Sequence, residues 1–210
     1  MKLPPARATV AIAGLTAVAY PISTLASPGL IALLAGLVPA RLSGVEVPGA
    51  VPAWLTPLTA TLLHGGVVHL AMNLLMLGFC GRLIEPAVGA RGVVLLYVVG
   101  AYAAGAAQWA WSPFDMTPMV GASGAISAVL ATYALLYGER RLTLRNAGLT
   151  RWANVAWLAA AWIGINLLVG VATRDSGMSV AVPAHIGGFV AGLLLTRPLL
   201  SWRFGRTRRH

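Results

Sequence analysis

The chain has 210 residues, of which 58% are hydrophobic and 10% are charged, and its mean hydropathy is +0.80. Soluble domains carry about 25% charged residues, so this composition excludes an ordinary soluble globular protein and indicates a polytopic membrane protein. The formal net charge is +10, which in a soluble protein would suggest a nucleic-acid partner, and the single cysteine, Cys80, excludes an intrachain disulfide.

The hydrophobic residues gather in six stretches of about 20 residues, which is the length that a helix needs to cross the hydrocarbon core of a bilayer. We therefore predict an all-α membrane protein, organised as a single polytopic domain over residues 1–210 with six transmembrane helices. The predicted spans are residues 7–26, 64–84, 92–112, 119–138, 152–172 and 181–199, followed by a basic tail over residues 200–210.

The charged residues are distributed unevenly between the segments that join these spans. If the N-terminus is inside, all but two of the 15 lysines and arginines fall on the inner side, and the exceptions are Arg41 and Arg174. This bias predicts that both termini are cytoplasmic. The compact chain of membrane spans fits a prokaryotic cell inner membrane, which is the predicted location. The net charge then indicates contact with anionic lipids of the bilayer and no nucleic-acid partner. Glu85, at the inner edge of the second span, is predicted to form an ion pair with Arg82 or Arg91.

The first span only partly resembles a signal peptide, because its apolar run exceeds the ~7–15 residues that are usual there, and we predict that it is retained. The next apolar run, 29–40, is too short to cross a bilayer and is predicted to lie in the outer interface, within a long external loop. A second outer loop, 173–183, contains glycine and serine and is predicted to be a mobile cap.

Three polar side chains interrupt the second span: His64, His69 and Asn73. Such side chains are costly inside a bilayer, so by default they face the interior of a helix bundle and mark function. His69 and Asn73 are four residues apart and share one helix face. For His64, the pattern favours an interhelical hydrogen bond that only stabilises the bundle.

Small residues line the beginnings of the fourth and sixth spans. Ser123 lies in a Gly-Ala-Ser-Gly sequence, which is either a packing surface or the setting of a nucleophile. In the sixth span Ala184, Gly188 and Gly192 recur every four residues, which lets another helix approach closely. We predict that this stripe packs against the small residues of the fourth span and brings His185 toward Ser123.

Spans two, four and six all run from outside to inside, so His69, Ser123 and His185 are predicted to lie within roughly 10 Å of the outer surface. Histidine is the usual base that activates a serine hydroxyl. No Asp or Glu lies within any predicted span, so the residues indicate a Ser–His dyad. His69, Asn73 and the backbone amide of Ser123 are predicted to donate hydrogen bonds to the oxyanion. No metal-binding spacing is present.

In this order, the sequences HGGVVHLAMN (64–73), GASG (121–124) and AHIGGFVAG (184–192) resemble the rhomboid family of intramembrane serine proteases, over about residues 59–200. The resemblance implies that Ser123 is the nucleophile and His185 the general base, with His69, Asn73 and the Ser123 amide as the oxyanion hole. It implies supporting roles for His64, Gly121, Gly124 and Gly188. It also implies no cofactor, and single-span transmembrane protein substrates that are cut near the outer face of the membrane.

Two positions depart from the family pattern. Ser127 stands four residues after the serine, where members often carry an aromatic residue stacked on the base, and the first external loop has Trp54 but no Trp-Arg pair. The alternative function is a catalytically silent rhomboid-like protein that binds transmembrane segments, and the presence of both Ser123 and His185 favours the protease. A small transporter would show internal repeats and paired broken helices, which the sequence lacks.

Overall fold

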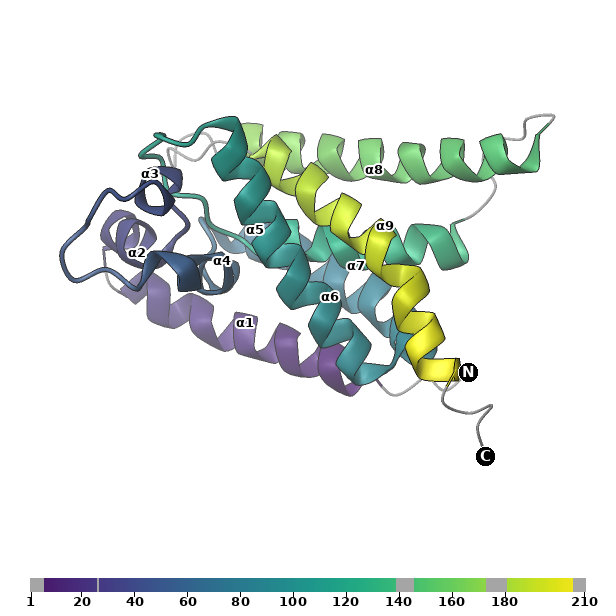
Figure 1. Ribbon diagram of the computed structural model, residues 1–210. Helices are drawn as coiled ribbons and strands as arrows, with labels where there is room; N and C mark the ends of the chain where they lie inside the picture. The colour runs from purple at the N-terminus through teal and green to yellow at the C-terminus, as the bar shows by residue number, and fades with distance from the viewer. Residues whose placement is uncertain (1–5, 26, 139–145, 173–180, 206–210) are drawn as a thin grey trace.

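The computed structural model describes residues 6–25, 27–138, 146–172 and 181–205. Within these residues the regular structure is helical, apart from one isolated bridge between Leu37 and Met119. The α-helices of Figure 1 are α1 (Arg7–Leu25), α2 (Pro28–Ala35), α3 (Pro39–Leu42), α4 (Thr56–Thr59), α5 (Val67–Met76), α6 (Arg82–Trp111), α7 (Ser123–Tyr137), α8 (Ala147–Ala172) and α9 (Val182–Gly205). A π-helical segment, Leu77–Gly81, joins α5 to α6, and short 3-10 turns at Ala53–Leu55 and Ala60–Leu62 flank α4.

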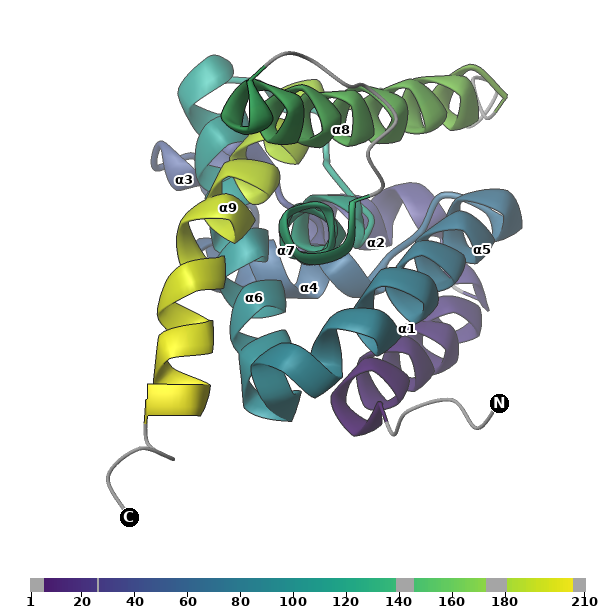
Figure 2. The same ribbon diagram turned by 90° about the vertical axis from the view of Figure 1, so that its right-hand side faces the viewer.

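Each predicted span overlaps one of the helices α1, α5, α6, α7, α8 and α9. By length and composition, two continuous stretches of the described chain are apolar enough to cross a membrane, Val67–Trp111 and Val182–Gly205, and Ser123–Tyr137 is a shorter apolar helix. The first stretch is more than one straight helix, because Gly89 has a non-helical φ of 79° and ψ of 163°. Figure 2 shows that α5 and α6 run in different directions on either side of this region.

Two helices begin later than the predicted spans. α7 begins at Ser123 and not at residue 119, because Gly121 has φ +115°, outside the range of a right-handed helix. α5 begins at Val67, so His64 lies in the segment before it. Figure 2 shows α7 end-on between α5, α6, α8 and α9, and most of its residues are buried. Its neighbours therefore enclose the short central helix that carries Ser123.

Helices α6, α7 and α9 approach one another along glycines. A Cβ atom added to Gly188 would lie 2.0 Å from the carbonyl oxygen of Gly124, and one added to Gly192 would lie 2.2 Å from that of Ala128. These neighbours are backbone atoms and cannot move aside cheaply. The predicted close packing of the fourth and sixth spans is therefore present, and glycine is required at both positions on α9.

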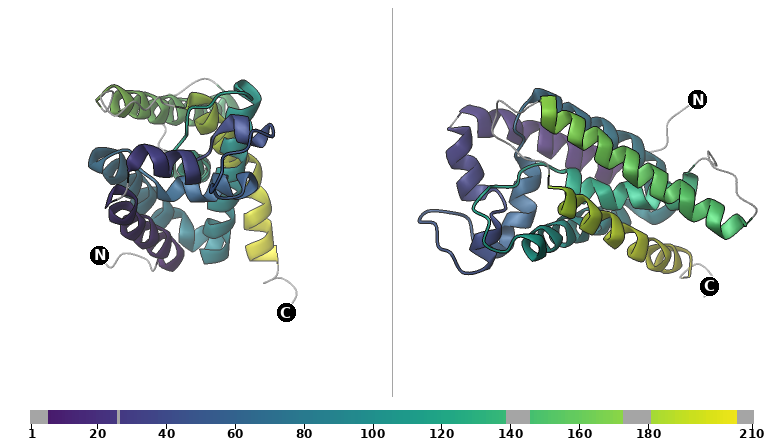
Figure 3. Two further views of the ribbon diagram at one scale, coloured as in Figure 1. Left: turned by 90° about the vertical axis from the view of Figure 1, so that its left-hand side faces the viewer. Right: turned by 90° about the horizontal axis from the view of Figure 1, so that it is seen from above.

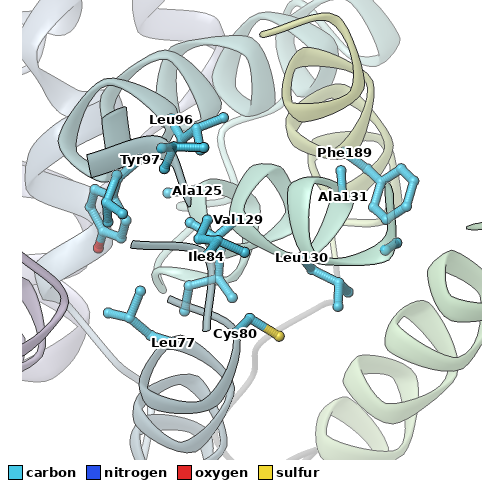
Figure 4. Close-up of a cluster of buried hydrophobic side chains, with 14 of the residues drawn as sticks. Leu77, Cys80, Ile84, Leu96, Tyr97, Ala125, Val129, Leu130, Ala131 and Phe189 are labelled. Carbon is cyan, nitrogen blue, oxygen red and sulfur yellow. The ribbon is translucent and has the colours of Figure 1, made fainter. Parts of the chain in front are cut away.

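The hydrophobic core lies where the end of α5 and the beginning of α6 meet α7. Figure 4 shows Leu77, Cys80 and Ile84 beside Ala125 and Val129 of α7, with Leu96, Tyr97, Leu130, Ala131 and Phe189 around them. Cys80 is buried in this cluster, as expected for a small apolar side chain. Val155 and Trp162 of α8 belong to the same cluster, so the core holds α7 between α8 and the beginning of α6.

The loop predicted to be the first external one forms an ordered layer at one end of the bundle, where the right-hand view of Figure 3 shows α2 and its neighbours together. Leu37 and Met119 exchange two backbone hydrogen bonds, of 3.0 and 2.7 Å, and the amide of Ala40 donates to the carbonyl of Asp115 at 3.0 Å. α2 has no buried residues, whereas Leu37 is fully buried. The loop therefore covers the segment that leads to Ser123.

Arg41, one of the two basic residues predicted to lie on the outer side, holds this loop together. Its side chain is buried, and its guanidinium group donates to the carbonyl oxygens of Leu34, at 3.4 Å, and of Val51. These two carbonyls lie on opposite sides of Arg41 in the chain. The side chain therefore ties the two ends of this loop together.

Glu85 has partners other than the predicted Arg82 or Arg91. Its buried carboxyl group accepts hydrogen bonds from the amides of Ala8 and Thr9, both at 3.0 Å, and from the hydroxyl of Thr9 at 2.7 Å. The first amides of a helix have no acceptor within the helix, and they favour a negative group. Glu85 of α6 therefore caps the N-terminus of α1.

We expect Glu85→Ala to lower the free energy of unfolding by about 2–4 kcal/mol, because it leaves buried donors without an acceptor. In a thermal unfolding experiment on the detergent-solubilised protein, this corresponds to a loss of roughly 5–10 °C. Thr9→Val is the matched control, since it removes one of the three hydrogen bonds and should cost clearly less. If Glu85→Ala unfolds at the wild-type temperature, the cap does not anchor α1.

Candidate active site

Ser123 occupies the first position of α7, where a sharp turn enters the helix. Gly121 makes this turn with φ +115°, and its amide donates to the carbonyl of Ala60 at 2.9 Å. The Ser123 side chain is 8% exposed. Because the first four amides of a helix lack intrahelical acceptors, the N–H of Ser123 is available to a ligand at this end. The helix dipole there also favours negative charge.

His185 lies in the first turn of α9 and contacts Ser123 directly. Its Nε2 atom is 2.9 Å from the Ser123 Oγ atom, and its Nδ1 atom is 2.8 Å from the carbonyl oxygen of Ala181. A carbonyl oxygen can only accept, so in the neutral ring Nδ1 carries the hydrogen and Nε2 accepts from the serine hydroxyl. The predicted proximity of the two residues is present, in the tautomer that a general base requires.

The close approach of α7 and α9 makes this contact possible. Gly188 lies one turn below His185, and its α-carbon meets the backbone of Gly124, the residue after the serine. A larger residue at Gly188 would separate the two helices, whereas a Cβ atom added to Gly124 would lie 2.6 Å from the side chain of Ala104 on α6. Gly188 therefore sets the distance between the hydroxyl and the imidazole.

His69 packs against the turn before Ser123. A Cβ atom on Gly121 would lie 2.7 Å from Nε2 of His69, so only glycine leaves room for this ring. The His64 ring meets that of His69 at 5.0 Å between centroids with an interplanar angle of 64°. His64 is thus a ring neighbour of His69, and its own ring nitrogens have no hydrogen-bond partner among the described residues.

Asn73 is buried one turn after His69 on α5. Its Nδ2 atom donates to the carbonyl oxygen of His69 at 2.9 Å. An amide nitrogen carries two hydrogens, so one remains for another acceptor. His69, Asn73 and the Ser123 amide stay the predicted oxyanion-binding groups.

Trp162 was not predicted as a site residue, because the fifth span indicated only an ordinary packed or lipid-exposed helix. Its indole N–H donates to Ser127 Oγ at 2.8 Å, and its ring meets that of His185. The only signal in the sequence was a tryptophan in an apolar helix, and this pattern cannot tell which neighbour the side chain faces. The contact depends on how α8 packs on α7.

Two other predictions concern cofactors and loops. In the part of the chain that the structure describes, no three His, Cys, Asp or Glu side chains group as a metal site would require. The predicted cap at 173–183 falls largely on residues 173–180, which lie outside the described residues.

The Rhomboid domain profile matches residues 52–202, a range that contains all the residues described above as the site. This chain belongs to the rhomboid family. The fold is accordingly that of a helical membrane protein of this family. The roles that the resemblance implied for Ser123, His185, His69 and Asn73 stay predictions.

Several rhomboid proteins are similar to this chain. It is 34% identical over 148 residues to rhomboid protease GluP of Bacillus subtilis (strain 168), covering 69% of this chain and 27% of that protein. It is 34% identical over 136 residues to rhomboid protease GlpG of Serratia proteamaculans (strain 568), covering 63% and 44%. It is 31% identical over 156 residues to RHOMBOID-like protein 2 of Arabidopsis thaliana, covering 69% and 44%. The chain spans less than half the length of these relatives.

Proposed function

We propose that this rhomboid-family chain is an intramembrane serine endopeptidase that acts through a dyad of Ser123 and His185. One observation carries the proposal: Nε2 of His185 accepts the hydrogen bond of the Ser123 hydroxyl while Nδ1 is committed to the carbonyl of Ala181. A base in this tautomer can take the serine proton as the hydroxyl attacks a carbonyl carbon. The Ala181 carbonyl also stabilises the imidazolium that then forms.

In the proposed reaction, Ser123 Oγ attacks the carbonyl carbon of the scissile peptide bond while its proton moves to His185 Nε2. The carbon–nitrogen bond then breaks, and His185 gives the proton to the leaving amine. Water next attacks the acylated serine, and His185 takes a proton from that water. The acid product leaves, and the proton returns to Ser123.

The negative charge that develops on the substrate oxygen needs donors on the side of the attacking serine. The amide of Ser123 is free at the start of α7, and His69 and Asn73 approach from α5. Donors held in a fixed, buried position stabilise such a charge more than water does, because they need no reorganisation. His64 would act by packing on His69.

We propose that the substrates are single-span transmembrane proteins, cut near the outer face of the membrane. A helical segment must unwind locally before its carbonyl carbon is accessible to Ser123, so we expect a preference for helices weakened by glycine or proline, with a small residue before the cut. The test compares the rate at which a substrate with a uniform Leu/Ala transmembrane helix is cleaved with the rate for the same helix carrying one Gly-Pro pair. Equal cleavage of the two would contradict this preference.

The proposed topology has six crossing helices with both termini in the cytoplasm, in a cell inner membrane. In Figure 1 the first turn of α1 and the last turn of α9 lie toward the same end of the bundle, away from α2, which supports it. To test the topology, a single cysteine is introduced in place of Leu30 or of Trp202 in a Cys80→Ala background. Both positions are exposed. In right-side-out vesicles, an impermeant maleimide should label only the cysteine in α2. Labelling at residue 202 would overturn the topology.

The proposed activity is tested by reconstituting the protein in vesicles with a tagged single-span substrate and by treating it with a serine-reactive phosphonate. We expect cleavage, and we expect the phosphonate to attach to Ser123 in mass spectra of the labelled protein. Labelling without cleavage would mean a competent site and an unsuitable substrate. Neither labelling nor cleavage would favour the silent protein that binds transmembrane segments.

A further inference from the structure

Trp162 and Ser127 connect three helices at the candidate dyad. The indole N–H of Trp162 on α8 donates to Ser127 Oγ at 2.8 Å, and Ser127 Oγ donates to the carbonyl oxygen of Ser123 at 2.8 Å. The Trp162 and His185 rings have centroids 6.3 Å apart and an interplanar angle of 78°. Both Trp162 and Ser127 are buried, at 3% and 0% exposure. One side chain of α8 therefore contacts both the base and the helix of the serine.

The hydrogen bonds of His185 leave one motion of its ring unrestrained. Nδ1 binds the Ala181 carbonyl and Nε2 binds the Ser123 hydroxyl, and hydrogen bonds to ring nitrogens are strongest in the plane of the ring. Two such contacts fix the ends of the ring but resist poorly its rocking about the line that joins them. An aromatic ring packed near-perpendicular to the imidazole blocks this motion and adds about 0.5–1.5 kcal/mol of its own.

Ser127 determines where the indole sits. Its hydroxyl accepts from Trp162 and donates to the carbonyl one turn earlier, so it bridges the indole to the backbone of Ser123. A buried indole N–H without an acceptor would be costly. The ring is therefore held at a fixed place relative to the nucleophile, although it belongs to another helix. Figure 2 shows α8 lying along one side of α7 and α9, where this contact is made.

We propose that Trp162, anchored by Ser127, is a positioning residue that keeps His185 in the orientation in which Nε2 accepts the Ser123 proton. The inference rests on the proposed protease function. It gives Ser127 a purpose that the family pattern did not predict, since its hydroxyl places an aromatic ring from α8 beside the base. It also couples the position of α8 to the geometry of the dyad.

Four variants in reconstituted vesicles test the inference. Trp162→Leu removes both the ring and the donor, Trp162→Phe keeps a ring, Ser127→Ala removes the anchor and Ser127→Thr keeps a hydroxyl. Because a misplacement of about 1 Å can cost about 100-fold in rate, we expect Trp162→Leu to lower kcat about 10- to 100-fold with KM changed less than about twofold. Ser127→Thr should recover most of the loss seen in Ser127→Ala. Trp162→Phe keeps a ring but loses the N–H that binds Ser127, so it should lose about as much as Ser127→Ala and less than Trp162→Leu.

Trp157→Leu is the matched control, because Trp157 lies on the same helix and is 51% exposed. It should leave kcat unchanged and should lower the unfolding temperature no more than Trp162→Leu does. A kcat for Trp162→Leu equal to that of Trp157→Leu would overturn the inference. An increase in KM with kcat unchanged would also overturn the inference, because it would place Trp162 in substrate binding.

A second measurement separates this inference from the proposed function. In protein with ¹⁵N-labelled histidine, the NMR signals of His185 should shift or broaden in Trp162→Leu and Ser127→Ala and should match wild type in Trp157→Leu. If the wild type neither cleaves nor reacts with phosphonate but this pattern holds, the proposed function fails and the positioning stands. If wild type cleaves and the His185 signals are the same in all variants, the positioning fails and the protease stands.

Discussion

Replacing either Ser123 or His185 by alanine is expected to abolish cleavage of a transmembrane substrate, with kcat lowered by at least about 10⁴-fold. The magnitude follows from soluble serine proteases, in which removal of either residue costs up to about 10⁶-fold. Ser123→Ala removes the attacking oxygen, and His185→Ala leaves the hydroxyl without the base that its 2.9 Å hydrogen bond now provides. Because the two groups act as a unit, the double variant should be no slower than either single variant.

The measurement is single-turnover cleavage in vesicles, together with thermal unfolding of each variant. Thr132→Val is a matched control, since it removes a buried hydroxyl from the same helix, one that bonds to Thr196 at 2.9 Å and not to the dyad. It should keep most of the wild-type kcat even if its unfolding temperature falls. Additive losses in the Ser123 and His185 double variant would contradict the dyad, because independent groups would then be responsible.

The positions of the long helices follow from the sequence because they depend on local properties. Length and hydropathy indicate six segments, and the small residues at Gly188 and Gly192 predict which helix packs closely on which. The beginnings of α5 and α7 could not be predicted in this way. The turn before Ser123 depends on the positive φ of Gly121 and on its hydrogen bond to Ala60, a residue of the preceding loop.

The candidate site was predictable where residue type alone restricts the chemistry. The sequence places a serine and histidines at a common predicted depth, in helices with small residues. This pattern predicted the contact between Ser123 and His185. Trp162 was not predictable, because its importance comes from Ser127, which is 35 residues away. Glu85 likewise acts on Thr9, which is 76 residues away, and charge alone had suggested a nearby arginine. Predicting such contacts requires knowing how the helices pack against one another, and a single sequence does not reveal this.

The second large effect is expected at the groups predicted to bind the oxyanion. We expect His69→Ala and Asn73→Ala each to lower kcat about 10²- to 10³-fold, as removal of one donor does in other serine proteases, with little change in KM. Asn73 is buried and its amide keeps one hydrogen beyond the bond to the His69 carbonyl. Single-turnover cleavage of the same substrate measures both variants. Rates within about threefold of wild type for Asn73→Ala would remove this residue from the oxyanion hole.

Gly121→Ala tests whether the place of the His69 ring matters, and not only its presence. The new Cβ atom would lie 2.6 Å from Cε1 of His69 and would push the ring away, while φ +115° would strain the backbone. We therefore expect a loss of kcat close to that of His69→Ala, and the two losses should not add in the double variant. Gly164→Ala is the control, because nothing lies within 4 Å of its added Cβ atom. If Gly121→Ala slows the His69→Ala variant by a further large factor, the glycine acts on the Ser123 turn itself, and His69 is not the group through which it affects the reaction.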